Sequence, residues 1–284
     1  SGRQQRVFWL ILALAFFLRV FWLGMKPPHF DEGVNGWFID QMTKTGYYHY
    51  DPGNYHGPFH FYVLFLFQTL FGRSIEALRM PLVLINVATV ALAFQFRRFL
   101  PWRACLLAAL AFAVSPGMLF YSRYAIHEAW LTFGAMLAFW GAAEMWSRGT
   151  VRGLWAAAMG VTLMILNKET CIIHLAAFGL AVGTLLLLER LAPSAPGLEK
   201  PAEPQWDAKK LADILAVSLL CLLFFYSGGF LDPSSLRGLV RTFADWFHTG
   251  VESDGHAKPF YYWLLLLIRY EWPALIGLAW SIRA

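Results

Sequence analysis

Long apolar runs separated by short polar segments occupy most of the chain, and this pattern predicts membrane-spanning helices. A helix needs roughly 20 apolar residues to cross a bilayer, with about 17 at the short end. Seven runs reach or approach this length, and we expect each to form a span: 7–25, 80–96, 104–121, 129–146, 154–167, 170–188 and 211–231. The predicted fold is therefore all-α, a polytopic transmembrane helical bundle.

A further apolar run, 59–71, is only 13 residues long and lies between Pro58 and Gly72. A run of that length favours an interfacial or re-entrant helix over a span. If it does not cross, the basic residues near the helix ends fall on one side, which the positive-inside rule makes cytoplasmic. These residues are Arg3, Arg6, Arg97, Arg98, Arg103, Arg148, Arg152, Arg190, Lys200, Lys209 and Lys210.

Composition agrees with a membrane protein. The chain is 58% hydrophobic and 14% charged, whereas a soluble domain carries about 25% charged residues. The net charge of +5 follows from the basic helix ends and requires no nucleic-acid partner. The cysteines lie inside apolar runs without paired spacing, which is typical of small buried hydrophobic residues: Cys105, Cys171 and Cys221.

The predicted connections differ between the two sides of the membrane. On the outer side we expect a long first loop with juxtamembrane helices at 26–79, tight turns at 122–128 and 168–169, and another loop at 232–258. The cytoplasmic side has a Pro-rich linker at 192–210. Residue types used in catalysis thus collect on the outer face, whereas a channel or carrier more often places its ionisable groups near the midplane.

Two adjacent carboxylates, Asp31 and Glu32, follow the first span by only a few residues. Charged groups are costly to hold near lipid, and ionisable residues at membrane depth indicate a functional site by default. A second interpretation stays open, in which both residues serve as N-cap or first-turn acids of a helix over 33–45.

The chain contains one internal repeat, because residues 56–62 resemble residues 256–262. In each copy a histidine shortly precedes a proline that opens an aromatic helix, where its missing N–H costs nothing. Aromatic residues prefer the membrane interface. We therefore expect both helices, the second at 259–272, to lie on the outer leaflet and bring His56 and His256 to the same cleft.

The stretch that follows the second aromatic helix, 273–284, is too short for another span. We therefore expect residues 1–284 to form a single membrane-embedded module that is truncated within a helix at its C-terminal end.

Five short segments spread over nearly the whole chain resemble motifs of the GT-C glycosyltransferases. They are His-Phe-Asp-Glu-Gly at 29–33, Tyr-His-Gly-Pro at 55–58, Tyr-Ser-Arg-Tyr-Ala-Ile-His-Glu at 121–128, Asn-Lys-Glu at 167–169, and 256–262. Within that superfamily the chain is similar to the dolichyl-phosphate-mannose protein mannosyltransferases and to a prokaryotic family of flippase-activity-associated proteins. The resemblance implies a multi-pass enzyme of the plasma membrane. Such an enzyme transfers a hexose, with inversion, from a polyprenyl-phosphate donor to a protein or lipid acceptor on the outer face.

The resemblance also implies roles for the acidic residues. Sugar transfer needs a base for the acceptor proton, and a carboxylate in a partly desolvated cleft can serve. Asp31 occupies the family's first-loop acidic position and is the first candidate, with Glu32 as the alternative. Glu128 occupies the second-loop acidic position, although it can equally serve as the N-terminal acid of the helix that follows.

The leaving phosphate needs cations or a metal ion to stabilise its charge. The outer-side cations are Arg123, Lys168, Lys258 and Arg269. His56, His256 and Glu169 complete the expected substrate-binding set. A divalent metal ion remains a possible cofactor, with Asp31, Glu128, His56 and His256 as weak ligand candidates, since no H-x-x-x-H spacing strengthens this signal.

Other interpretations compete for several of these residues. Arg123 and Lys168 have the alternative of snorkelling at the interface, and His56 and His256 that of capping loops. Gly57 stands where some relatives carry a lysine before the first-loop proline, which weakens phosphate binding at that point. An Asp-x-Asp in the second loop, present in the oligosaccharyltransferase branch, is missing here.

Two further functions remain open from the sequence. A flippase or carrier for polyprenyl-linked sugars predicts intramembrane polar groups and inverted repeats, and the internal repeat lies instead in outer interfacial helices. A non-catalytic scaffold would not require the set of Asp31, Arg123, Glu128 and Lys168.

Overall fold

The computed structural model describes residues 2–54, 56–191, 201–252, 259, 261–270 and 275–276. The chain divides into two compact units, Ser1–Phe243 and Ala244–Ala284. Every secondary-structure element assigned within the described residues is a helix, which confirms the predicted all-α fold.

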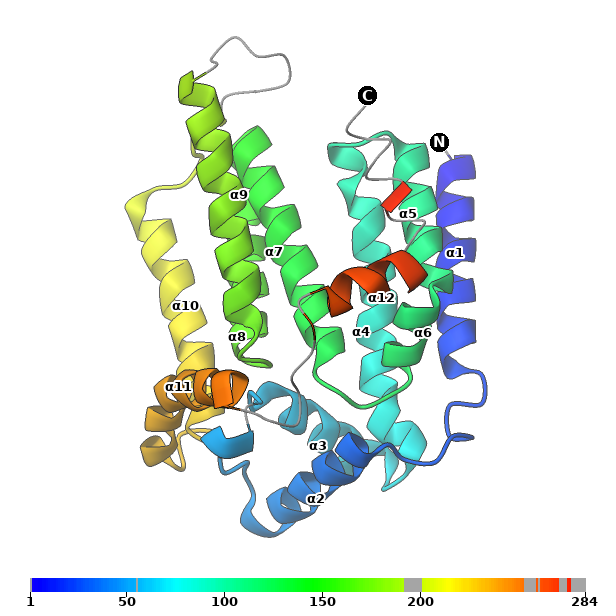
Figure 1. Cartoon of the computed structure of the whole chain (residues 1–284), viewed down its shortest axis with the longest axis vertical. Helices are drawn as coiled ribbons and strands as arrows, with labels where there is room; N and C mark the ends of the chain where they lie inside the picture. Colours follow the sequence, from blue (N-terminus) through cyan, green and yellow to red (C-terminus); the bar gives the residue numbers. More distant parts are fainter. Residues whose placement is uncertain are drawn as a thin grey trace. The chain divides into compact units, whose positions relative to one another are not determined.

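Most helices of the first unit run side by side (Figure 1). They are α1 (Gly2–Val20), α4 (Ile75–Gln95), α5 (Trp102–Val114), α6 (Pro116–Ser122), α7 (Glu128–Arg148), α8 (Val151–Ile165), α9 (Cys171–Leu191) and α10 (Ala208–Tyr226). The connections contain α2 (Phe30–Thr45), α3 (Phe59–Phe71) and the 3-10 turns η1 (Pro52–Asn54), η2 (Phe96–Arg98) and η3 (Pro233–Ser235). Helix α11 (Leu236–Glu252) continues from the first unit into the second, which also contains α12 (Tyr262–Tyr270).

Among the described residues, length and apolarity alone qualify two helices as membrane spans, Ile75–Arg98 and Cys171–Leu191. Helices α5 and α6 together form a third candidate. Helices α1 and α10 each carry three charged residues, and α8 has only 15 residues, so they do not qualify on their own. These apolar helices make the chain a membrane protein, with fewer qualifying spans than the seven predicted.

The predicted span 104–121 is not one continuous helix. It breaks between α5 and α6, whose axes differ by 56°. Pro116 has no N–H to continue the α5 ladder, and the Ser115 hydroxyl accepts a hydrogen bond from the Met118 N–H and so starts α6. The sequence did not predict this break, because apolar length alone does not reveal the effect of a proline on the helix.

Two arginines donate hydrogen bonds to backbone carbonyls at this break and at the end of α1. Arg19 is fully buried and donates to the Phe112 and Ala113 carbonyls at the end of α5. Arg123, which follows α6, donates to the Leu18 and Trp22 carbonyls near the end of α1. A cation at a helix C-terminus also complements the helix dipole, so the two arginines tie α1 to the α5–α6 break.

Helices α7 and α8 form the closest hairpin of the fold. A Cβ on Gly141 would lie 2.3 Å from the Ala157 nitrogen, and one on Gly160 would lie 2.5 Å from the Ala138 nitrogen. Only glycine permits this backbone approach. The hairpin therefore sets the start of α7 and the end of α8 at the same end of the bundle.

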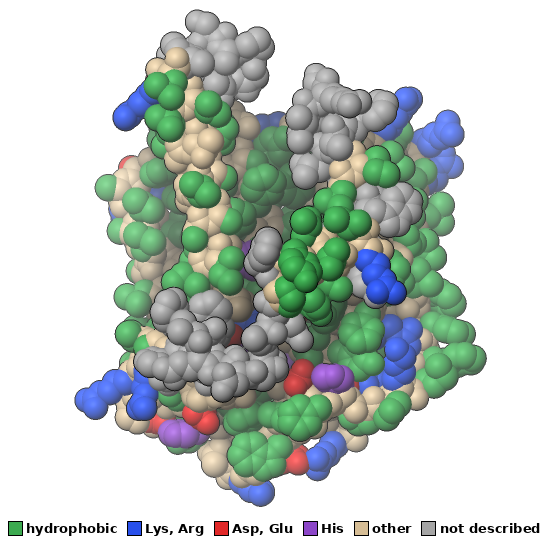
Figure 2. Space-filling model, in the orientation of Figure 1, with side chains coloured by type: hydrophobic (Ala, Val, Ile, Leu, Met, Phe, Trp, Pro, Cys, Tyr) green, Lys and Arg blue, Asp and Glu red, His purple; other side chains and the backbone are tan. Residues whose placement is uncertain are grey.

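That end also carries α2 and α3, whereas the N-terminus, η2 and the α7–α8 turn lie at the opposite end (Figure 1). Helix α3 has the predicted bounds and lies beside α2 rather than running through the bundle. On the face drawn in Figure 2, most acidic and histidine side chains lie at this end. Which end faces the cell exterior stays a prediction.

Two predicted connections differ in part from the structure. The expected loop 232–258 contains η3 and α11, because apolar residues at helical spacing, such as Leu236, Leu239 and Phe243, pack against the bundle. In the expected linker 192–210, residues 192–200 lie outside the described residues and α10 already begins at Ala208.

Candidate functional site

A buried ion pair between Glu32 and Arg79 organises the start of α2. The two side chains are at most 1% exposed, and the Arg79 guanidinium donates to both carboxylate oxygens at 2.8 and 2.7 Å. Glu32 also accepts hydrogen bonds from the backbone N–H groups of His29 and Ala125, both at 2.9 Å. Arg79 in turn donates to the carbonyls of Leu23, Lys26 and Pro27. This clamp joins the α1–α2 connection, α2, α4 and the α6–α7 loop.

The protonation of Glu32 reflects these contacts. Burial by itself raises the pKa of this carboxyl, but the hydrogen bonds from Arg79, His29 and Ala125 outweigh burial, so the pKa lies below its usual value. With His29 as N-cap, Glu32 completes a capping box for α2. All its contacts are internal, which favours a structural role over that of a base.

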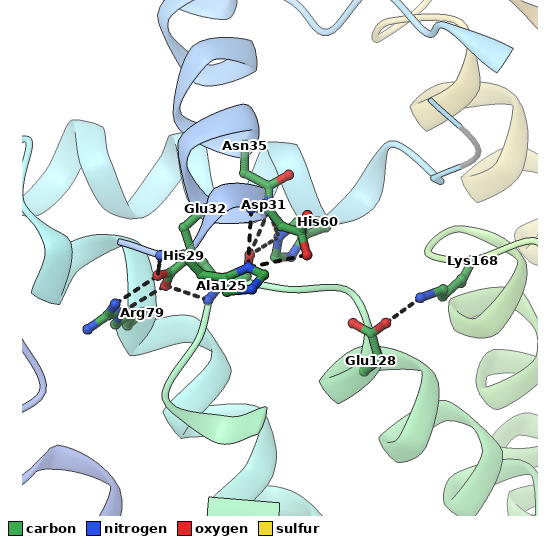
Figure 3. Close-up of polar contacts among 9 residues, drawn as sticks. All are labelled: His29, Asp31, Glu32, Asn35, His60, Arg79, Ala125, Glu128 and Lys168. Carbon is green, nitrogen blue, oxygen red and sulfur yellow. Dashed lines mark hydrogen bonds and ion pairs between the residues drawn. The ribbon is translucent and has the colours of Figure 1, made fainter. Parts of the chain in front are cut away.

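Asp31 differs from its neighbour because it is exposed. Its side chain is 57% accessible, and its Oδ2 lies 3.4 Å from Nδ1 of His29. In Figure 3 the Asp31 carboxylate points away from Arg79, toward the side on which Glu128 and Lys168 lie. Of the two adjacent carboxylates, only Asp31 is open to a bound molecule.

Glu128 and Lys168 form the second ion pair of the site (Figure 3). Glu128 is the first residue of α7 and Lys168 lies in the turn after α8, so the α7–α8 hairpin brings them together. The Glu128 side chain is 40% exposed and that of Lys168 16%. An ammonium held by one partly exposed carboxylate is able to bind a phosphate instead.

The segment before α3 pairs with the turn that carries Lys168. His56 and Lys168 form an antiparallel β-bridge, and the Gly57 N–H donates to the Asn167 carbonyl at 3.1 Å. A Cβ on Gly57 would lie 2.2 Å from the Leu166 oxygen. The glycine that departs from the lysine of some relatives is therefore required for this close approach.

This pairing also brings histidines and Glu169 to the site. Nδ1 of His56 lies 3.6 Å from Oε2 of the buried Glu169. The His56 ring lies 4.4 Å from the ring of His127, which lies 4.1 Å from the ring of His60. The three imidazole rings thus lie in contact, with neighbouring planes tilted by 45° and 48°.

The inner histidines form a neutral, hydrogen-bonded support. His60 accepts a hydrogen bond from the Trp130 indole at 3.0 Å, and Asn35 of α2 donates to the Ala125 carbonyl at 2.6 Å. Burial lowers the pKa of His60 to about 3. For His127, burial is again the largest cause of a pKa well below the usual value, followed by the neighbouring histidines. These groups hold α2 and α3 against the α6–α7 loop.

The remaining predicted residues are placed as follows. Arg123 contacts the carbonyls near the end of α1 described above. Arg269 lies in the last turn of α12, in the second unit. His256 and Lys258 lie outside the described residues, so the predicted repeat with 56–62 stays a prediction.

No group of three or more His, Cys, Asp or Glu side chains within the described residues is arranged to hold a metal ion. Of the candidate ligands, Asp31 lies beside His29. Glu128 forms an ion pair with Lys168. The described residues therefore do not fit the divalent ion considered from the sequence.

Two cavities flank α2. One of about 1060 Å³ lies between α2, α3 and the start of α4, and Trp37, Asp40 and Arg73 are among its lining residues. The other, of about 740 Å³, lies between α2 and η1, and its lining includes His29 and Phe30, the residues just before Asp31. Asp31 itself is not among the lining residues of either cavity.

Sequence reasoning missed Arg79, His60 and Asn35. Arg79 is the last residue of the predicted first loop, 26–79, and hydropathy does not distinguish a buried, paired arginine from an exposed one. His60 and Asn35 carry no local signal, since their role depends on contacts between α2, α3 and the α6–α7 loop.

The fold resembles that of a solved membrane enzyme. The structure of the S. cerevisiae protein O-mannosyltransferase Pmt1-Pmt2 complex bound to the sugar donor matches with a TM-score of 0.56 and 16% sequence identity. The match covers 89% of this chain and 34% of that chain, so this chain spans about a third of the relative's length. At this identity the similarity establishes the helical membrane fold of GT-C glycosyltransferases.

The sequence adds a family match. Residues 55–194 match the model of the dolichyl-phosphate-mannose-protein mannosyltransferase family, a range that includes α3 to α9 and the Glu128–Lys168 pair. A comparison with curated proteins found no match. The fold and the family match thus make this chain similar to the GT-C glycosyltransferases.

Proposed function

We propose that this chain transfers a sugar from a polyprenyl-phosphate donor to a protein or lipid acceptor. The reaction takes place at the end of the bundle that carries α2 and α3, which we propose faces outward from the plasma membrane. The observation that carries this proposal is the contrast between adjacent carboxylates: Glu32 is locked to Arg79, and Asp31 projects from the rigid helix start. The family match and the donor-bound relative support this choice of donor class.

In this proposal Asp31 accepts the proton of the acceptor hydroxyl. A base must lie within hydrogen-bond reach of the proton it removes, and the exposed side chain of Asp31 is accessible to an acceptor hydroxyl. The bond from the anomeric carbon to the phosphate oxygen breaks and releases the polyprenyl phosphate, which is already a good leaving group, so the donor end requires charge stabilisation rather than a strong acid. In an inverting reaction the acceptor oxygen attacks the anomeric carbon from the face opposite the phosphate.

Lys168 supplies that charge stabilisation. Its ammonium forms an ion pair with Glu128. When the donor binds, its phosphate takes a share of the ammonium's hydrogen bonds, because a charge-assisted bond to phosphate is at least as favourable as one to carboxylate. Glu128 then keeps Lys168 oriented, and His56 lies beside both through its backbone bridge.

The test is an assay of label transfer. The protein in nanodiscs is incubated with radiolabelled polyprenyl-phosphate sugars and an acceptor fraction from membranes, and the label is followed into protein, lipid and water. Transfer to protein or lipid by the wild type, but not by Asp31→Asn, is the expected result. A carrier would move labelled donor across a vesicle bilayer without new glycosidic bonds, and a scaffold would do neither. Either outcome would overturn the proposal.

A further inference from the structure

Glu169 is a buried carboxylate whose pairing in the site is incomplete. Its side chain is 4% exposed, and its Oε2 atom has no hydrogen-bond partner among the described residues. Burying a charge is costly unless it is paired and hydrogen-bonded. Within the described residues, His56 is the only basic side chain within 4.0 Å of this carboxylate, with Nδ1 at 3.6 Å from Oε2. Glu169 therefore depends on His56 for a partner.

The ring of His56 is held by several elements at once. Its backbone is bridged to Lys168, and its ring lies against His127 at 4.4 Å. Nδ1 is buried and points toward Glu169, while the side chain as a whole is 33% exposed. The exposed edge of the ring is therefore the side that carries Nε2. His56 also interacts electrostatically with Glu128.

No other polar group of the described residues is hydrogen-bonded to the Oε2 atom of Glu169. Tyr50 and Tyr226 interact electrostatically with Glu169, and both are buried phenols. The Tyr226 hydroxyl already donates to the Ile165 carbonyl at 2.8 Å. Asn167 presents a buried Oδ1, an acceptor that cannot bind a carboxylate oxygen.

We propose that Glu169 is a positioning residue that fixes the tautomer of His56, and that Nε2 of His56 then contacts a hydroxyl of the donor sugar. A proton on Nδ1 donates to Glu169, which leaves the Nε2 lone pair on the exposed edge of the ring. A lone pair accepts a hydrogen bond from a hydroxyl, whereas a phosphate oxygen has none to donate. Lys168 thus binds the phosphate and His56 binds the sugar. This inference rests on the proposed transferase function.

The distance of 3.6 Å from Nδ1 to Oε2 is longer than a formed hydrogen bond. Catalytic hydrogen bonds are often long before substrate binds and tighten in the complex. A shift of a few tenths of an ångström at either side chain is sufficient to close it.

The first experiment reads the tautomer directly. The wild-type protein, labelled with ¹⁵N-histidine, is examined by long-range ¹H–¹⁵N NMR, with His56→Asn used to assign the His56 signals. We expect His56 to carry its proton on Nδ1 in wild type and to change its tautomer distribution in Glu169→Leu. A His56 protonated on Nε2 alone, or on both nitrogens in the donor-bound protein, would overturn the assignment of Nε2 as a hydroxyl acceptor.

The second experiment is a double-mutant cycle on transfer activity. Losing one hydrogen bond to substrate is expected to reduce kcat/KM about tenfold to hundredfold in His56→Asn. If Glu169 acts through His56, Glu169→Leu shows a similar loss, and the double variant is no worse than His56→Asn alone. Glu169→Gln, which keeps an acceptor oxygen, should stay within a few-fold of wild type. Losses that multiply in the double variant would contradict the positioning role.

The exposed Glu203, near the start of α10, provides the matched control. Glu203→Leu should leave both kcat and KM unchanged. If Glu169→Leu does not fold, the NMR measurement on wild type and the activity of Glu169→Gln still test whether Glu169 positions His56. If wild type transfers no sugar from any donor, the proposed function fails, whereas the tautomer measurement still tests the Glu169–His56 contact.

Discussion

The Glu32–Arg79 pair offers a sharp test of how the site is held. We consider Glu32→Gln, which keeps the size of the side chain and removes its charge. In wild type the carboxylate accepts two hydrogen bonds from Arg79 and one each from His29 and Ala125. In the variant one oxygen becomes an NH₂ group that faces a donor, and the Arg79 charge stays buried without its partner.

The expected loss is large because neither group can reach water. Breaking a buried ion pair by removing one partner costs about 3–5 kcal/mol. A control lies nearby in Arg73 and Asp40, which are 2.6 Å apart but 76% and 36% exposed. An exposed pair contributes about 0–1 kcal/mol, so Asp40→Asn, the same chemical change, should have a much smaller effect.

The assay is equilibrium unfolding in mixed micelles, followed by tryptophan fluorescence. We expect Glu32→Gln to lose about 3–5 kcal/mol of unfolding free energy and Asp40→Asn at most about 1 kcal/mol. Replacing both partners with apolar residues, in Glu32→Leu/Arg79→Met, should recover part of the loss because no charge remains buried. If Glu32→Gln and Asp40→Asn lose equal stability, the clamp does not hold the site as described.

The pKa of Glu32 adds a pH dependence to the same measurement. Since the pKa is lower in the folded state, the stabilisation is complete above the unfolded-state value of about 4.3. It is lost as the pH falls through the folded-state pKa. The unfolding free energies of wild type and Glu32→Gln should therefore converge as the pH is lowered below about 4. A difference that stays constant down to pH 3 would contradict the sign of this shift.

Three further predictions concern the site and its orientation. Lys168→Gln should weaken donor binding about tenfold or more, because a charge-assisted hydrogen bond to the phosphate is lost; binding titrations with a polyprenyl phosphate measure this, and unchanged affinity would remove Lys168 from the donor site. Gly57→Ala should lower thermal stability and activity together, because its Cβ would lie 2.2 Å from the Leu166 oxygen; a variant with wild-type melting would refute the close approach. Cysteines placed at the exposed positions Asp51 and Ser147 should react with an impermeant reagent from opposite sides of the membrane, and labelling of both from one side would refute the orientation.

The sequence predicted the helices whose ends carry strong local signals. Helix α3 has the bounds expected for it, since Pro58 precedes it and Gly72, with φ of +81°, follows it. The break in 104–121 was missed because the apolar run continues through Pro116. Helix α11 was missed because its charged residues obscured an apolar stripe, which only the packing of Leu236, Leu239 and Phe243 reveals.

For the candidate site, the sequence supplied candidate residues but not the contacts that distinguish one from another. Asp31 and Glu32 are adjacent and chemically alike, and only the partner supplied by α4 separates a locked carboxylate from an exposed one. Likewise Glu128 and Lys168 are 40 residues apart, and their pairing depends on the α7–α8 hairpin. Such long-range contacts cannot be deduced from local spacing.

Asp31→Asn tests the central claim most directly, because the account assigns the chemical step to this one exposed carboxylate. Donor affinity and turnover are measured on the same preparation, with radiolabelled polyprenyl-phosphate sugar and a saturating acceptor. The account predicts unchanged folding and donor binding, and turnover lower by about 10²–10⁴-fold, the usual contribution of a general base. Turnover equal to that of wild type would contradict it and move the role of base to another carboxylate.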